Sequence, residues 1–149
     1  MTRHAVGRLP FDERGGLVVL VDPGRSTPDE AFALASRAAD GGACGFLVGD
    51  SLGQGGTVAE HVAALRAGSG GAPVVQFPAS ALELSADVDA VLFLVLLSGR
   101  NPRYLIEEQL DAVPFFDKHP RVTAVSTAYL LIDGGRVSSV ERVTGTQPL

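Results

Sequence analysis

The fold class is decided by the stretch Asp89-Ala-Val-Leu-Phe-Leu-Val-Leu-Leu-Ser-Gly-Arg-Asn-Pro-Arg-Tyr-Leu-Ile-Glu-Glu-Gln109. Its first half is an unbroken apolar run, which is typical of a strand covered on both faces in a parallel sheet. Asn101-Pro102 then offers a helix N-cap followed by a proline suited to the first helical position. Ile106, Leu110 and Val113 recur at helical spacing. The stretch therefore predicts a β/α unit: a strand, a polar loop and a capped helix.

Similar units occur elsewhere in the chain. Further strands are predicted at residues 16–22, 44–49, 72–77 and 123–132. Thr27-Pro-Asp-Glu30 and Thr57-Val-Ala-Glu60 are capping boxes, which predict helices ending near residues 39 and 67. Residues 78–87 favour no helix. The repeat of about 30 residues is typical of β/α units, and it fits either an open doubly wound sheet or part of a barrel.

The tail of the chain has a different pattern. Asp133-Gly134-Gly135 predicts a tight turn that leads into residues 136–142, as in a hairpin.

Composition limits the classes of protein that the chain can represent. With 149 residues, 46% hydrophobic and 19% charged, residues 1–149 are expected to form one domain with a core. A net charge of −5 without a basic run disfavours a nucleic-acid partner. A single cysteine, Cys44, favours the cytoplasm, and the apolar run at 88–97 is shorter than the ~20 residues that a membrane span needs. His4, His61 and His119 show no ligand spacing and are expected at the surface.

Several motifs resemble those of the geranylgeranylglyceryl phosphate synthase-like prenyltransferases, a family that includes the bacterial heptaprenylglyceryl phosphate synthases. The family's L-I-D-P is similar to Leu20-Val21-Asp22-Pro23, its V-G-G-S to Val48-Gly49-Asp50-Ser51, and its F-P-G to Phe77-Pro78-Ala79. Its D-A-I-L-F-M-S-L-L-N-S-R-N-P-Y-Y-L-I-G-x-Q resembles residues 89–109, and the tail at 128–141 also resembles the family. Each short motif is weak, but five of them in order are specific.

The resemblance implies a fold and an activity. Members have a (β/α)₈ TIM barrel in which an irregular segment replaces the third helix, and residues 78–87 fit that description. About five β/α units would make an incomplete barrel. Members transfer a polyprenyl group from its diphosphate to glycerol 1-phosphate with Mg²⁺, which forms an ether lipid precursor. We therefore expect an Mg²⁺-dependent prenyltransferase that uses a phosphorylated hydroxy acceptor.

Two positions match the metal ligands of the family, Asp22 and Ser51. A carboxylate just beyond a barrel strand can hold Mg²⁺, a hard cation that takes oxygen ligands and bridges to diphosphate. From the residues alone, Asp22 is equally well explained as a turn aspartate before Pro23. Ser51 alone is more typical of a loop or cap serine, and its role as a ligand depends on the resemblance.

The resemblance also indicates diphosphate contacts at Arg25, Gly49, Asp50 and Arg100. Asp50 departs from the family, which has a glycine there. Its negative charge would repel a diphosphate unless a metal ion lies between them. Arg25 is equally well explained as a solvated side chain, and Asn101 beside Arg100 as the helix cap. Phe32, Phe77 and Phe93 are candidates for an apolar lining, although core packing also explains them.

Part of the family's site has no counterpart in the sequence. The expected general base and the glycerol-phosphate pocket belong to family segments that would follow Leu149. Unpaired first and last strands predict association into a homo-oligomer or with a second half-barrel chain. The alternative function is a non-catalytic half-barrel partner subunit or a prenyl-diphosphate-binding module.

Overall fold

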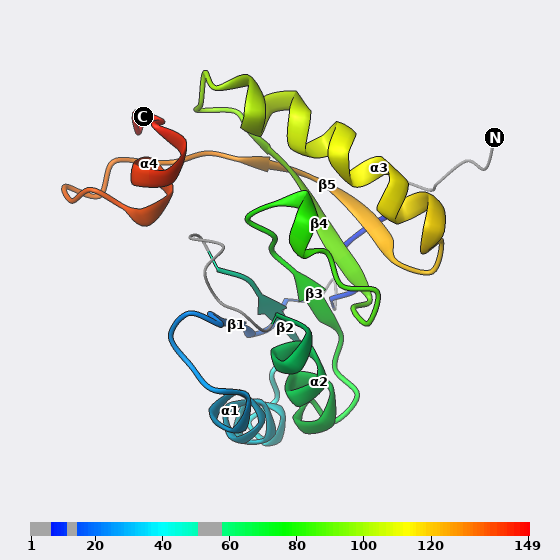
Figure 1. The fold of residues 1–149 in the computed structure, drawn as a ribbon. Coiled ribbons are helices and arrows are strands. Elements are labelled where there is room, and N and C mark those ends of the chain that lie inside the picture. The colour runs from blue at the N-terminus through cyan, green and yellow to red at the C-terminus, as the bar shows by residue number, and fades with distance from the viewer. Residues whose placement is uncertain (1–6, 12–14, 51–57) are drawn as a thin grey trace.

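The computed structural model describes residues 7–11, 15–50 and 58–149 (Figure 1). Its strands are β1 (Val18–Val21), β2 (Gly45–Val48), β3 (Val74–Gln76), β4 (Ala90–Leu96) and β5 (Thr123–Tyr129). Its α-helices are α1 (Pro28–Asp40), α2 (Val58–Gly68), α3 (Glu108–Lys118) and α4 (Ser139–Thr144). A short 3-10 helix, η1 (Ala81–Glu83), lies between β3 and β4, and a π-helix, η2 (Arg103–Glu107), precedes α3.

The five strands form one parallel sheet in the order β1-β2-β3-β4-β5. Each strand therefore pairs with the next one in the chain, as Leu20 with Leu47 and Leu92 with Val125 illustrate. A doubly wound sheet would reverse its order at a switch point, whereas a TIM barrel keeps it. The order thus decides between the two architectures that the sequence left open, in favour of part of a barrel.

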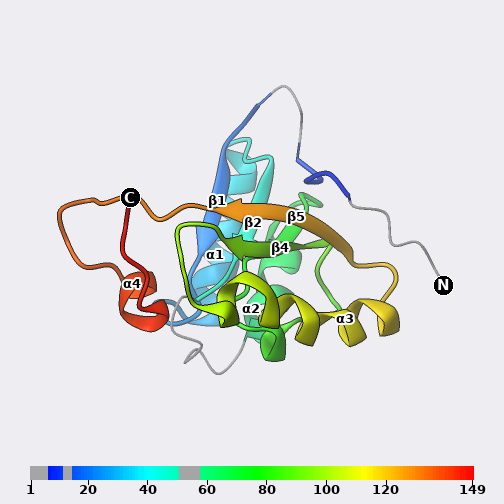
Figure 2. The same cartoon turned by 90° about the horizontal axis from the view of Figure 1, so that it is seen from above.

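Alternation along the strands creates two apolar layers. One layer lies between the sheet and the helices and includes the fully buried Phe46, Val48 and Val74. The other lies on the inner face of the sheet, where Phe11 and Phe77 pack against a cluster formed by Val75, Ala90, Leu92 and Val125. Figures 1 and 2 both show α4 apart from the other three helices, beyond the end of β5.

The first β/α unit follows the predicted local rules. The Thr27 hydroxyl oxygen accepts a hydrogen bond from the Glu30 N–H, and the Thr27 N–H donates to Glu30 Oε2 at 2.8 Å, which completes the capping box of α1. Pro28 occupies the first turn. Gly68, at the end of α2, brings that helix close to α1, since an added Cβ would lie 2.6 Å from the Phe32 carbonyl oxygen.

The β/α unit that begins at residue 89 also forms, but its helix does not bury the apolar residues from which it was predicted. Asn101 Oδ1 accepts a hydrogen bond from the Arg103 N–H at 3.0 Å, which confirms its capping role. The helix that follows buries Ala112 and Phe116. Ile106, Leu110 and Val113 lie on the exposed side of this segment, so their helical spacing predicted the helix but does not mark its buried face.

Two predictions were wrong. Residues 136–142 do not form the second arm of a hairpin: the turn at Asp133 is present, but α4 follows it, with a capping box between Ser138 and Glu141. The Ser-x-x-Glu spacing signals this helix in the sequence. His61 is not at the surface, because only 2% of it is exposed.

The sheet has two open edges among the described residues. β1 and β5 each pair with one other strand. At the start of β5, the Gly7 N–H donates to the Ala124 carbonyl oxygen at 3.2 Å, which covers one point of that edge. Leu20, whose side chain belongs to the inner-face pocket described below, is 52% exposed. No described helix is both long enough and apolar enough to cross a membrane.

Candidate active site at the carboxyl ends of the strands

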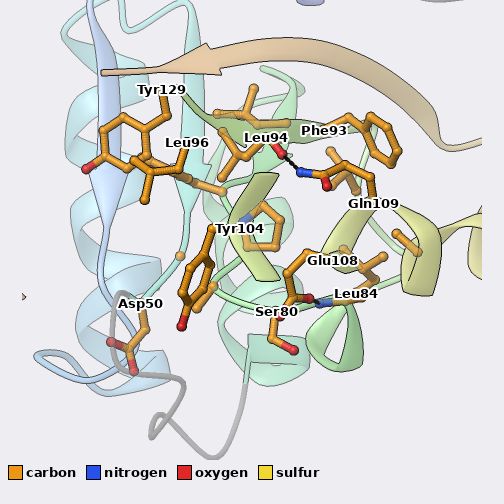
Figure 3. Close-up of a pocket in the computed structure, with 18 of the residues that line it drawn as sticks. Asp50, Ser80, Leu84, Phe93, Leu94, Leu96, Tyr104, Glu108, Gln109 and Tyr129 are labelled. Carbon is orange, nitrogen blue, oxygen red and sulfur yellow. Dashed lines mark hydrogen bonds between the residues drawn. The ribbon is translucent and has the colours of Figure 1, made fainter. Parts of the chain in front are cut away.

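A cavity of about 260 Å³ opens where the strands end (Figure 3). Residues at or near the ends of all five strands line it, together with η1, the segment from Tyr104 to Phe116, and α4. In Figure 3 the Asp50 carboxylate lies at one end of the pocket and Phe93 lies at the opposite end. The carboxyl ends of barrel strands are where such folds carry their chemistry, so this cavity is the candidate active site.

The polar end is built by the loops after β1 and β2. Asp22 Oδ1 accepts a hydrogen bond from the Gly24 N–H at 2.8 Å, and Asp50 is 7% exposed. A Cβ atom added to Gly24 would lie 3.2 Å from Asp22 Oδ1 and 3.3 Å from Asp50 Oδ2. The two carboxylates therefore face the same small space beside Gly24.

This pair fits a divalent cation of the magnesium type. Mg²⁺ prefers oxygen ligands and is commonly held by one or two carboxylates together with substrate phosphates. Among the described residues no group of three or more His, Cys, Asp or Glu side chains converges, so a closed protein cage is not formed there. Ser51, the other predicted ligand, lies outside the described residues.

Of the four residues predicted at the diphosphate, the structure brings Gly49 and Asp50 to the pocket beside Asp22. Arg25 points largely into solvent, with 83% of its side chain exposed, and its Nε lies 3.3 Å from Asp22 Oδ2. Arg100 is exposed and is not part of the pocket lining. Contacts of these four residues with a diphosphate stay predictions.

Gly49 has a packing role in addition to its predicted place at the site. A Cβ atom at this position would lie 1.9 Å from the Phe77 carbonyl oxygen. The backbone of Phe77 also donates a hydrogen bond to the Val48 carbonyl oxygen at 2.8 Å. The absence of a side chain at Gly49 thus lets the ends of β2 and β3 approach each other at the pocket.

The other end of the pocket is apolar. Phe93 lines it and makes an edge-to-face contact with Phe116, with ring centroids 5.7 Å apart. Phe77 also lines the pocket, and its ring makes an edge-to-face contact with Tyr129, with centroids 5.6 Å apart. Burial raises the pKa of the Tyr129 hydroxyl. Phe32 lies on α1, is 45% exposed and is not part of the lining. Two of the three aromatic candidates therefore line the pocket.

One wall of the pocket joins η1 to α3. Glu108 Oε2 accepts a hydrogen bond from the Ala81 N–H at 2.7 Å, and Glu108 Oε1 lies 2.8 Å from Arg103 Nε. Burial, followed by the negative charges of Asp50 and Glu108, raises the pKa of Glu83. Glu108 thus links η1 to the segment that begins α3.

A second contact ties the same wall to the sheet. Gln109 Nε2 donates to the Leu94 carbonyl oxygen, and the buried Gln109 Oε1 has no hydrogen-bond partner among the described residues (Figure 3). The Tyr104 hydroxyl donates to the Val143 carbonyl oxygen of α4 at 3.5 Å. Tyr104, Glu108 and Gln109 were not among the predicted site residues. The four-residue separation of Tyr104 and Glu108 is the spacing that places two side chains on one face of a helix.

Fold and site together define the class: a TIM-barrel-type β/α protein whose pocket has a cation-fitting acidic end and an apolar end. The chain belongs to the PcrB family, whose family model matches residues 11–148.

Named relatives and a solved structure agree with this assignment. The chain is 37% identical over 133 residues to the geranylgeranylglyceryl phosphate synthase of Flavobacterium johnsoniae, covering 89% of this chain and 54% of the relative. It is 34% identical over 143 residues to that of Korarchaeum cryptofilum, covering 95% of this chain and 57% of the relative. The chain therefore spans little more than half the length of these relatives.

The fold is similar to the crystal structure of (S)-3-O-geranylgeranylglyceryl phosphate synthase from Thermoplasma acidophilum in complex with its substrate sn-glycerol-1-phosphate. The TM-score is 0.80 at 28% identity, and the match covers 91% of this chain and 55% of that one.

Proposed function

We propose that this chain forms the metal- and diphosphate-binding part of an Mg²⁺-dependent prenyltransferase. The observation that carries the proposal is a single pocket with the paired carboxylates of Asp22 and Asp50 at one end and an apolar aromatic wall at the other. A polyprenyl diphosphate has the same division, with an anionic head and an apolar tail. The names of the relatives and the substrate of the Thermoplasma acidophilum enzyme support transfer to glycerol 1-phosphate or a related phosphorylated hydroxy compound.

The residues suggest how the donor is held. Asp22, with Ser51 as the predicted second ligand, would hold Mg²⁺, which supplies charge neutralisation at the diphosphate as it leaves. Asp50 faces the same space, so its carboxylate would help to hold the cation, and its negative charge would disfavour a direct contact with the diphosphate. Phe93 and Phe116 would surround the tail. The acceptor hydroxyl would attack the allylic carbon as the carbon–oxygen bond to the diphosphate breaks, and its proton would pass to a base not assigned among these residues.

We further propose that the chain associates through its open sheet edges, either with another copy or with a second half-barrel chain. Parallel strands with apolar inner faces are stable when both edges are paired or covered. β1 and β5 each have one strand partner among the described residues, and Leu20 leaves half of its surface exposed on the inner face. A cytoplasmic location stays a prediction that rests on cysteine usage.

A second candidate function is a non-catalytic module that binds a prenyl diphosphate or supports a partner subunit. The observation in its favour is Asp50, which places a buried carboxylate where the family resemblance has a glycine. The prenyltransferase and the donor-binding module both require the donor to bind, whereas a partner subunit does not. Only the prenyltransferase requires turnover when the rest of the barrel and an acceptor are supplied.

Calorimetric titration with geranylgeranyl diphosphate tests the proposal. We expect binding that requires Mg²⁺, disappears with EDTA and is lost in Asp22→Ala. Asp29→Ala is the matched control, because Asp29 is an exposed carboxylate in the first turn of α1, outside the pocket lining. Failure of the folded parent to bind the diphosphate at any Mg²⁺ concentration would contradict both candidate functions that require the donor.

A further inference from the structure

His61 is a buried polar side chain that has no assigned role in the pocket. It lies on α2, it is 2% exposed, and it is not part of the pocket lining. Its Nε2 atom lies 2.8 Å from the Ser26 carbonyl oxygen, 35 residues earlier in the chain. A carbonyl oxygen only accepts hydrogen bonds, so Nε2 carries the proton and donates it.

The bond from His61 reaches the loop that carries Asp22. The Ser26 hydroxyl donates to the Asp22 carbonyl oxygen at 3.0 Å, and the Arg25 N–H donates to the same oxygen at 3.0 Å. The Gly24 N–H holds Asp22 Oδ1 at 2.8 Å. Residues 22–26 thus form a closed turn, and His61 ties the far end of that turn to α2.

A fixed turn matters here because the two carboxylates beside Gly24 repel each other. Asp50 is held in the buried end of the pocket, whereas Asp22 lies on a turn whose neighbour Arg25 is mostly solvated. Without an anchor, the turn would relax away from Asp50 and the space between the carboxylates would widen. A metal site loses affinity when its ligands have to be brought together on binding.

We propose that His61 is a positioning residue for Asp22: its hydrogen bond to Ser26 holds the 22–26 turn so that the Asp22 carboxylate stays beside Gly24, facing the same space as Asp50. The inference rests on the proposed function where it concerns the cation. The anchoring of the turn is a property of the protein alone.

The test compares His61→Leu, which fills the space without a donor, with His61→Gln, which keeps an N–H donor. Ser26→Ala removes the next bond in the same chain at a partly exposed site. Hydrogen exchange at the Gly24 and Arg25 amides reports the turn, and the amide of Leu65 on α2 reports the helix as an internal control. Calorimetry with inorganic pyrophosphate and Mg²⁺ reports the site.

We expect His61→Leu to speed exchange at Gly24 and Arg25 but not at Leu65. We expect it to weaken Mg²⁺-dependent pyrophosphate binding by up to roughly 10-fold, the low end of the effect of removing a direct partner of a metal ligand, because His61 reaches Asp22 only through the turn. His61→Gln restores both properties in large part, and Ser26→Ala weakens binding in the same direction. In an Asp22→Ala background, His61→Leu has no further effect on binding, because its influence passes through Asp22.

Unchanged exchange at Gly24 in His61→Leu would overturn the inference, as would equal losses of affinity in His61→Leu and His61→Gln. A folded parent that bound no pyrophosphate with Mg²⁺ would overturn the proposed function and the cation half of the inference. Faster exchange at Gly24 would then still support the anchoring of the turn, so the two failures are distinguishable.

Discussion

Among the described glycines, Gly49 has the closest backbone neighbour for an added Cβ atom. A Cβ atom 1.9 Å from the Phe77 carbonyl oxygen would force the ends of β2 and β3 apart. We expect Gly49→Ala to destabilise the fold by about 1–3 kcal/mol or more, the usual cost of overpacking a site that has little room to relax. Urea unfolding measures this cost.

Gly134→Ala is the matched control for that measurement. An added Cβ at Gly134 meets nothing within 4 Å, so we expect a change close to zero. Equal stability of Gly49→Ala and the parent would show that β2 and β3 do not approach each other as described.

Glu83 makes stability depend on pH in an unusual direction. Burial and the charges of Asp50 and Glu108 raise its pKa in the folded protein above the ordinary value of 4.5. The contribution of Glu83 to stability is therefore fully present below that ordinary value and is lost as the pH rises through the raised one. We expect Glu83→Gln to be more stable than the parent at about pH 7 and to have no such advantage at about pH 4.

Thermal unfolding at the two pH values measures the effect. Glu107→Gln is the control, since 53% of the Glu107 side chain is exposed. A Glu83→Gln variant less stable than the parent at the higher pH would contradict the partly buried placement of this carboxyl.

The roles of some of these residues could be predicted from the sequence, and those of others could not. Asp22 and Gly49 are the last residues of predicted strands, so their place at the mouth of the pocket was indicated by local pattern and resemblance. The pairing of Asp50 with Asp22, the burial of His61 and the environment of Glu83 depend on contacts between distant segments. Periodicity in one segment carries no information about such contacts.

At the scale of elements, the wall made by η1 and α3 depends on one carboxylate. Glu108 accepts the Ala81 N–H and pairs with Arg103. Glu108→Ala leaves the Ala81 N–H without its partner, which costs about 1–3 kcal/mol for a buried donor. We expect lower stability and faster amide exchange across residues 80–84, and Glu108→Gln recovers part of the loss because its amide oxygen still accepts.

Hydrogen exchange measured by mass spectrometry checks this prediction, with Glu107→Ala as the control on the neighbouring exposed carboxylate. Unaltered exchange across residues 80–84 in Glu108→Ala would show that η1 is held by other contacts.

Elements with strong local signals were predicted well. The five strands and the first capped helix followed from apolar runs and a capping box. The tail was predicted wrongly because the turn at Asp133-Gly134-Gly135 is also typical of a hairpin, whereas here it precedes the Ser138–Glu141 capping box that starts α4. The π-helix before α3 shifts the register of that segment, which helps to explain why Ile106 and Leu110 are exposed.

For the whole molecule, the open edges lead to a prediction about association. The described inner face ends at strands with one partner each, and Leu20 and Ile132 are more than half exposed. We expect the isolated chain to sediment as an oligomer at micromolar concentration, because paired edges bury backbone groups and apolar surface. A stable monomer in sedimentation velocity would contradict this.

The order of the strands was not predictable from the sequence alone. Local patterns indicated five β/α units but left an open sheet and a barrel equally acceptable. The sequential order of the five strands is a property of the assembled sheet. Family resemblance favoured the barrel, and the fold and its likeness to the Thermoplasma acidophilum enzyme confirm it.

We expect one pocket to hold a metal-bound diphosphate at Asp22 and a polyprenyl tail beside Phe93. A crystal structure of the chain with Mn²⁺ and an unreactive thio analogue of geranylgeranyl diphosphate tests it most directly. We predict an anomalous manganese peak within bonding distance of the Asp22 carboxylate. The polyprenyl tail is expected to lie along the wall formed by β4 and α3. A manganese peak at another place, or a tail outside this pocket, would contradict the assignment.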